Sequence, residues 1–293
     1  MHAIGTVRVL GSVDASTTDN PVHLPGLRTQ ELLAALALHA EHGIRRDQLC
    51  GSIWPDSPQV TARRALNTEL WRLRAAIRDA GGDSDQWIES TSNEVRLCTD
   101  NGVAVDLDRF RSVSEGGLGS DPAQIADAVK LYRGDFADGL DAEWIMGMRG
   151  QVRRQFVSML ESAVEQLCQR ELFDTAASYA ERLVDEEPLD ERGHRALLLI
   201  RIRTGDHAAA VRHFQELRES FQSELGIEPS PATCALVEQL MESTPAPRNF
   251  TFDRVEREVA PMGLQQHLAR LRETAERLLR QIDEVHREVV RDS

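Results

Sequence analysis

Residues 59–80 have the sequence QVTARRALNTELWRLRAAIRDA. Placed on a helical wheel at about 100° per residue, the apolar side chains gather on one face: Ala62, Leu66, Leu70, Leu73 and Ile77. The opposite face carries Arg64, Thr68, Trp71 and Ala75. The stretch therefore predicts an amphipathic helix with a buried stripe and an opposite face rich in positive charge and hydrogen-bonding groups.

The elements predicted around this helix follow the order of a winged helix. Strands are predicted at 4–10 and 22–24, with a polar turn region at 14–21 between them. Two helices follow, at 27–41 and 47–54, the second with Asp47 as its N-cap and Pro55 at its end. After the long helix, residues 87–89 and 94–97 predict a hairpin around a polar turn. Strands, three helices and a hairpin indicate a winged helix-turn-helix.

The polar face of the long helix has the residue types that recognise double-stranded DNA. In a major groove Arg suits guanine or phosphate, Asn suits adenine, and Thr suits a thymine methyl group or phosphate. An exposed Trp71 suits a sugar-phosphate edge, and Arg96 alternates outward in the hairpin, toward phosphate or the minor groove. A solvated arginine-rich face is the alternative that periodicity leaves open. The residues expected to bind DNA are Arg63, Arg64, Asn67, Thr68, Trp71, Arg72, Arg74 and Arg96.

The charge distribution is compatible with DNA binding, although the net charge is −14. Most of the acidic excess lies beyond residue 100, whereas residues 61–79 hold five arginines against Glu69 and Asp79. A local positive stripe on an acidic protein limits indiscriminate DNA binding and leaves recognition to a few contacts.

From Val103 onward the sequence predicts helices and no strands. A long helix is expected at 142–170, followed by helical hairpins in which Ala176 and Leu183 correspond to Ala210 and Leu217. The offset between these residues is 34, the period of a tetratricopeptide repeat. Stacked helix pairs present a concave surface suited to a partner segment. The alternative is a spacer that only packs against the winged helix.

The C-terminal part predicts a linker and then a coiled coil. Apolar residues after Pro261 recur at alternating steps of four and three, as in a heptad repeat. A two-stranded coiled coil and a homodimer are expected, and a single helix docked on its own chain is the alternative. The expected dimerisation residues are Leu264, Leu268, Leu271, Leu278, Ile282, Val285 and Val289.

Several classes of protein are disfavoured by what the sequence lacks. The four cysteines lie far apart, without a Cys-x-x-Cys pair, which argues against a zinc site or disulfide framework and fits a reducing cytosol. The N-terminal residues lack the long apolar core of a signal peptide, and the most apolar stretch, 32–38, is too short to span a bilayer. No phosphate-binding loop and no catalytic constellation are found. We expect a cytoplasmic protein that is not an enzyme and has no metal, cofactor or membrane partner.

Five motifs, in order along the chain, resemble the Streptomyces antibiotic regulatory protein family. The first is ARRALNTELWRLR at 62–74, which is similar to the recognition helix of that family. The others are similar to its bacterial transcriptional activation domain: VDLDRF at 105–110, LYRGDF at 131–136, EPLDE at 187–191 and ELGIEPSP at 224–231. The resemblance covers about residues 4–243.

The resemblance implies an OmpR-type winged helix joined to a tetratricopeptide-like activation domain. It also implies binding to direct repeats upstream of promoters and recruitment of RNA polymerase holoenzyme, often for secondary-metabolite gene clusters. By position it places Arg64, Asn67, Thr68, Trp71 and Arg72 on the DNA-facing part of the helix, and Arg96 in the wing. The wing turn departs from the family in lacking a glycine, and Glu94 would repel phosphate.

The sequence therefore predicts a mainly α protein that activates transcription. Its expected parts are an N-terminal winged helix-turn-helix with small β-sheets at 1–100, an all-α tetratricopeptide-like domain at 101–243, a linker at 244–261 and a C-terminal coiled-coil helix at 262–293. Two other functions stay open: a repeat-type adaptor whose winged helix does not bind DNA, and a ligand-gated regulator or enzyme that uses the repeat concavity.

Overall fold

The computed structural model describes residues 3–116 and 122–241. These residues fall into two compact units that divide between Ala163 and Val164. The linker predicted at 244–261 and the coiled-coil helix predicted at 262–293 lie outside the described residues, and so do all the expected dimerisation residues.

The first unit begins with a four-stranded sheet in the order β3-β2-β1-β7. Its strands are β1 (Gly5–Arg8), β2 (Asp14–Thr17), β3 (Pro21–Val22) and β7 (Val103–Val105). β1 pairs antiparallel with β2 and parallel with β7, so a strand from beyond residue 100 completes the N-terminal sheet.

Two of these strands correct the sequence prediction. β2 lies where a polar turn was predicted, and β7 lies where only helices were predicted. In β2 the side chains alternate between buried and half-buried, with Ala15 and Thr17 facing inward. Strands this short take their conformation from the neighbouring strand, so the local pattern carries little signal.

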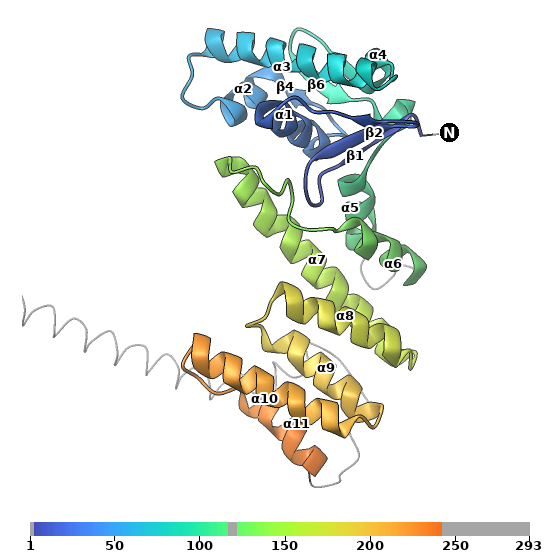
Figure 1. Ribbon diagram of the computed structural model, residues 1–293, viewed down its shortest axis with the longest axis vertical. Helices are drawn as coiled ribbons and strands as arrows, with labels where there is room; N and C mark the ends of the chain where they lie inside the picture. The colour runs from blue at the N-terminus through green and yellow to red at the C-terminus, as the bar shows by residue number, and fades with distance from the viewer. Residues whose placement is uncertain (1–2, 117–121, 242–293) are drawn as a thin grey trace, which may run out of the picture. The chain divides into compact units, whose positions relative to one another are not determined.

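Three helices follow the first hairpin, as predicted. They are α1 (Leu27–Leu38), α2 (Arg46–Ile53) and α3 (Gln59–Asp79), and each packs on the other two (Figure 1). The predicted apolar stripe of α3 is buried throughout, from Ala62 to Ile77. The expected N-cap at α2 is wrong: the helix begins after Arg45, and Asp47 lies in the first turn with its carboxylate on Arg63.

The wing is a three-stranded sheet in the order β4-β6-β5. It consists of β4 (Ile44–Arg45), β5 (Ile88–Ser90) and β6 (Glu94–Leu97), with β5 and β6 forming the predicted hairpin. Trp87, predicted in the first strand of the hairpin, instead ends the short helix α4 (Ser84–Trp87) and is fully buried. Its ring lies against β1 at Gly5, where no side chain would fit. A turn of 3₁₀ helix (Thr99–Asn101) leads from β6 to β7.

The end of β1 is held by a buried carboxylate. Asp106, the first residue of α5 (Asp106–Gly116), is 4% exposed and accepts the backbone N–H of Val9 at 2.9 Å and of Leu10 at 3.1 Å. Burial raises the pKa of this carboxyl, while the N–H donors act in the opposite direction. The VDLDRF motif thus joins the last strand of the sheet to the first helix of the following region.

The LYRGDF motif also binds the chain just beyond the end of β1. It follows α6 (Pro122–Leu131), and the backbone N–H of Arg133 donates to the carbonyl of Leu10 at 3.2 Å. Gly11 in turn donates to the carbonyl of Asp135 at 3.0 Å. Tyr132 stacks on Phe156 of α7 (Glu143–Gln169), with ring centroids 3.9 Å apart.

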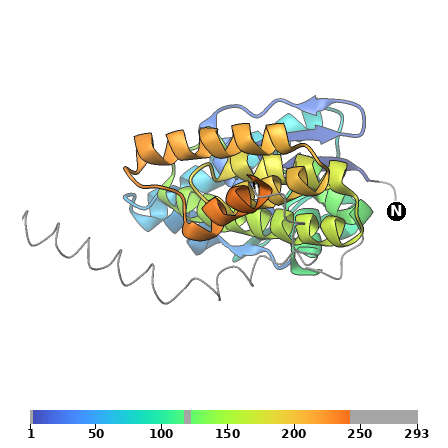
Figure 2. The ribbon, with the colours of Figure 1, turned by 90° about the horizontal axis from the view of Figure 1, so that it is seen from below.

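The second unit is helical in its described part. After the end of α7 it contains α8 (Phe173–Glu186), α9 (Glu191–Arg203), α10 (His207–Glu224) and α11 (Pro231–Met241). α9 packs against α8, α10 and α11, and Figure 2 shows α10 and α11 side by side. The small residues Ala176, Ala180 and Ala210 are fully buried where these helices meet. The mainly α fold with small N-terminal sheets is therefore confirmed.

Two family motifs meet at the start of α9. Glu191 of the EPLDE motif accepts the backbone N–H of Ser230 at 2.8 Å and its hydroxyl at 2.6 Å, and also the hydroxyl of Thr233. Ser230 belongs to the ELGIEPSP motif and directly precedes α11. One carboxylate thus fixes the loop that leads into the last described helix.

A pair of buried histidines lies between α9 and α10. Nδ1 of His194 and Nε2 of His213 are 3.1 Å apart, and Nε2 of His194 is 2.9 Å from the carbonyl of Pro188. A carbonyl only accepts, so His194 carries its proton on Nε2 and His213 donates to its Nδ1. Burial, together with the nearby charges of His194 and Arg201, lowers the pKa of His213 to about 4.

We expect Asp106→Ala to reduce the free energy of unfolding by about 2–4 kcal/mol, because two backbone N–H groups lose their acceptor inside the protein. Urea denaturation of the variant and the parent protein measures the difference. Asp106→Asn keeps one carbonyl acceptor and should lose less, and Asp56→Ala in an exposed turn should change stability by no more than about 0.5 kcal/mol. Equal stability of Asp106→Ala and the parent protein would contradict this role.

The histidine pair should make folding stability depend on pH. Folding lowers the pKa of His213 from 6.5 to about 4, so the unfolded chain binds the proton more readily between these values. The free energy of unfolding should therefore fall by roughly 2–3 kcal/mol between pH 7 and pH 4.5. His213→Gln should remove this part of the pH dependence, whereas His207→Gln, at an exposed position, should keep it. The same slope in parent protein and His213→Gln would show that the pair does not titrate in this way.

Candidate nucleic-acid interface

The polar face of α3 is exposed along its length. Arg64, Thr68 and Trp71 lie along one line of this face, where successive residues are three or four positions apart. Trp71 is 66% exposed, which is unusual for so large an aromatic side chain outside a binding surface. The structure brings together six of the seven α3 residues expected to bind DNA: Arg63, Arg64, Asn67, Thr68, Trp71 and Arg72.

Arg64 is the cation of this face that is left for a ligand. Across residues 3–116 and 122–241 its guanidinium has neither a hydrogen-bond acceptor nor a carboxylate partner. Its backbone carbonyl accepts the hydroxyl of Thr68 at 3.1 Å, a contact within the helix. Arg64 is therefore charged, exposed and available to an acceptor outside the chain.

On the side of α2, the neighbouring arginines already have partners. Nη2 of Arg63 donates to Asp47 at 2.8 Å, and this hydrogen bond lowers the pKa of the Asp47 carboxyl. Asn67 accepts from Nη2 of Arg46, a residue that the sequence analysis did not single out. The sequence did offer a signal for Arg46. Arg45 and Arg46 stand together directly before the short helix predicted at 47–54.

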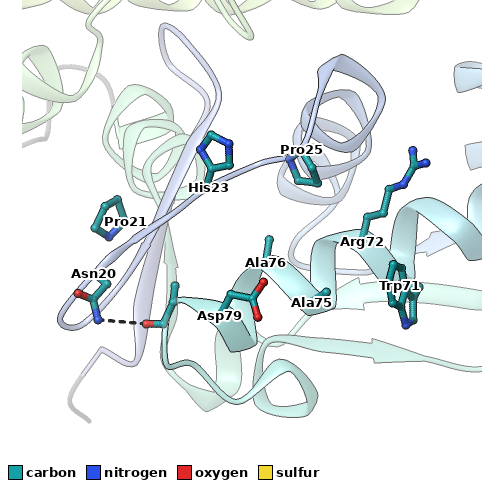
Figure 3. A pocket seen from close by; sticks show the side chains of 10 residues that line it. Asn20, Pro21, His23, Pro25, Trp71, Arg72, Ala75, Ala76 and Asp79 are labelled. Atoms are coloured by element: carbon teal, nitrogen blue, oxygen red, sulfur yellow. Dashed lines mark hydrogen bonds between the residues drawn. The ribbon is translucent and has the colours of Figure 1, made fainter.

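On the opposite side α3 borders a hollow of about 640 Å³. Figure 3 shows Trp71 and Arg72 at one end of it, and Asn20 at the other, where its side chain donates to the carbonyl of Ala80. Arg72 donates to Glu69 at 2.7 Å, and that buried carboxylate also accepts the hydroxyl of Thr29 at 2.7 Å. The hollow is lined by Asn20, Pro21, His23, Pro25, Trp71, Arg72, Ala75, Ala76, Asp79 and Ala80.

The remaining two expected residues are engaged with the wing. Arg74 is half-buried and donates to the carbonyl of Ile88 at 3.1 Å, so it joins α3 to β5 away from the exposed face. Arg96 is bound by Glu89 at 2.6 Å and by Asp100 at 3.2 Å, and these hydrogen bonds raise its pKa. Its charge is therefore largely matched by carboxylates of the same chain.

In the two described ranges, no three histidine, cysteine or carboxylate side chains come together as metal ligands would. Every helix of these ranges is too short or too polar to cross a bilayer.

Comparison with known proteins places the chain among bacterial regulators. Residues 105–241 match the family model of the bacterial transcriptional activator domain. The transcriptional regulatory protein MoaR1 of Mycobacterium tuberculosis is 28% identical over 251 residues, covering 81% of this chain and 79% of that protein. The regulatory protein DnrI of Streptomyces peucetius is 22% identical, covering 82% and 93%. The regulatory protein AfsR of Streptomyces coelicolor is 23% identical over 81% of this chain but only 24% of its own length.

A solved structure has the same fold. It is that of Mycobacterium tuberculosis EmbR in complex with a low-affinity phosphopeptide, with a TM-score of 0.64 and 19% identity, covering 88% of this chain and 69% of that one. The fold, the activator-domain match and the named relatives agree with one another. The activator-domain match and the named relatives support a transcriptional regulator of the Streptomyces antibiotic regulatory protein type.

Proposed function

We propose that this regulator binds double-stranded promoter DNA by inserting the exposed face of α3 into the major groove. The observation that carries the proposal is Arg64, an exposed cation without a partner in the described residues, in line with Thr68 and Trp71. An arginine in this position suits the two acceptors of guanine, and the threonine suits a thymine methyl group or a phosphate. Trp71 would lie against a sugar-phosphate edge beside the groove.

The paired arginines at the borders of the face would supply phosphate contacts. Exposed ion pairs contribute only about 0–1 kcal/mol, so a phosphate oxygen can replace Asp47 on Arg63, or Glu89 on Arg96, at little cost. Arg72 is held more firmly, because its partner Glu69 is itself buried and bonded to Thr29. Arg74 contributes by fixing the wing to α3, since its guanidinium donates to β5.

The proposal extends to what the bound protein does. The activator-domain match and the relatives named as regulatory proteins support control of transcription. We propose that the chain occupies direct repeats upstream of promoters and that its helical region recruits RNA polymerase holoenzyme, for a secondary-metabolite gene cluster. The heptad residues from Leu264 to Val289 would hold two chains together.

The first test is DNA binding by Arg64→Ala. Fluorescence anisotropy with fragments of the promoters that neighbour its own gene, at several salt concentrations, measures both affinity and sequence preference. We expect the parent protein to prefer some fragments, with affinity falling steeply in salt, and Arg64→Ala to lose about 1–3 kcal/mol of that preference. Arg212→Ala, an exposed arginine of α10, is the matched control and should bind as the parent does. Absence of binding by every variant would favour a repeat-type adaptor whose winged helix does not bind DNA.

Trp71 offers a second test, because its contribution to folding and to binding should separate. Trp71→Ala removes a side chain that is 66% exposed, so the free energy of unfolding should change by no more than about 0.5 kcal/mol. Affinity for the preferred promoter fragment should nevertheless fall several-fold in the anisotropy measurement. Leu189→Ala, at an exposed apolar position in the second unit, should leave affinity unchanged. Unaltered DNA affinity of Trp71→Ala would place the tryptophan outside the interface.

A further inference from the structure

Arg46 joins the recognition helix to the wing. Its Nη2 donates to the side-chain oxygen of Asn67 on α3, and its Nη1 donates to the hydroxyl of Ser90 on β5 at 2.9 Å. Its backbone N–H donates to the carbonyl of Asn93 in the wing turn at 2.8 Å. Arg46 begins α2 and is half-buried, so its guanidinium is fixed between α3 and the wing.

This contact settles which way the amide of Asn67 points. The oxygen and nitrogen of a side-chain amide are hard to tell apart by shape alone, and the hydrogen-bond partner has to decide. A guanidinium has donors and no acceptor, so the atom that faces Arg46 must be the amide oxygen. The NH₂ group of Asn67 is then the end left for a ligand. It lies on the exposed face of α3, three residues from Arg64 and four from Trp71.

The orientation of the amide changes which base suits this position. An asparagine that recognises adenine uses both ends of its amide, donating to N7 and accepting from the N6 amino group. Here the amide oxygen already accepts from a cation, whose positive charge disfavours a second donor at that oxygen, and the other groups at Asn67 and Arg46 are donors. The amino groups of adenine and cytosine would face donors, whereas N7 and O6 of guanine are both acceptors.

We propose that Asn67 donates to a guanine in the major groove and that Arg46 is the positioning residue that sets this preference. Arg46 acts by holding the amide oxygen and by presenting positive charge to any base edge that carries an amino group. The proposal rests on the proposed DNA binding by α3. It assigns the pair a choice of base different from the adenine that asparagine alone would favour.

The test is selection of binding sites from a duplex library with a randomised centre, followed by anisotropy on the selected duplex. The full chain would be used as parent, Asn67→Ala, Arg46→Ala and the double variant. We expect the parent to select a guanine at one position and to lose roughly ten- to hundredfold in affinity when it is replaced by adenine. Replacement by 7-deazaguanine, which lacks the N7 acceptor, should also weaken binding. Both single variants should lose the preference, and the double variant should lose no more than either, because the two residues act as one unit.

Two further variants keep the test decisive. Arg45→Ala is the matched control, since Arg45 is exposed and its side chain donates to Gln48 at 3.3 Å, not to α3. It should retain the guanine preference. Ser90→Ala replaces Arg46→Ala if the latter does not fold. It removes the side-chain hydrogen bond that holds Arg46 to the wing and should weaken the guanine preference.

Three outcomes would overturn the proposal. The first is a parent protein that selects adenine at the position lost in Asn67→Ala. The second is an Arg46→Ala variant that weakens binding equally for all duplexes with a smaller salt dependence, which is the behaviour of a phosphate contact alone. The third is a parent protein that binds no duplex of the library. This outcome would also overturn the proposed DNA binding, whereas the first two would leave it standing.

Discussion

The carboxylate of Asp106 fixes the first unit, because it supplies the acceptor for two backbone N–H groups just beyond β1. Buried backbone groups without partners are strongly unfavourable, so the end of β1 depends on the chain that follows residue 100. On one side β7 pairs with β1 and runs directly into Asp106. On the other, the LYRGDF segment bonds to Leu10 and Gly11. The four-stranded sheet and the first helices of the activator region are therefore one packed body within the first unit.

In this structure, the motifs that mark the activator region hold loops and the end of β1 in place through hydrogen bonds. Asp106 binds the chain just beyond the end of β1. Glu191 binds the loop before α11 through Ser230 and Thr233. Asp190 caps α9 by accepting the backbone N–H of Arg192 at 2.9 Å. All three are carboxylates at turns or at the start of a helix, where a backbone N–H group has few other acceptors. Their spacing along the chain thus reflects the construction of the fold and not a reactive site.

Carboxylates determine which cations of the exposed face of α3 and of the wing are available. Asp47, Glu69, Glu89 and Asp100 each bind an arginine, while Arg64 has no such partner in the described residues. On a chain with a net charge of −14, this arrangement keeps general attraction for phosphate low and concentrates it at few positions. The contact between Arg46 and Asn67 orients the amide of Asn67, so that its NH₂ group is the end that faces outward. In the proposed DNA complex, affinity and base preference are thereby assigned to different side chains.

The sequence by itself determined the elements whose signal is local and long. The spacing of apolar residues predicted α3 and its buried stripe, the hairpin of the wing was recognisable from β-branched residues around a polar turn, and small residues 34 positions apart marked the helix pairs. Tertiary structure decided the features that depend on a partner far away in the chain. β2 and β7 are strands only because β1 lies beside them. Arg74 is directed to the wing, and Asp47 binds Arg63 instead of capping its helix. Periodicity reports which face of an element is buried, but the atom that a polar side chain meets is fixed only when distant segments come together.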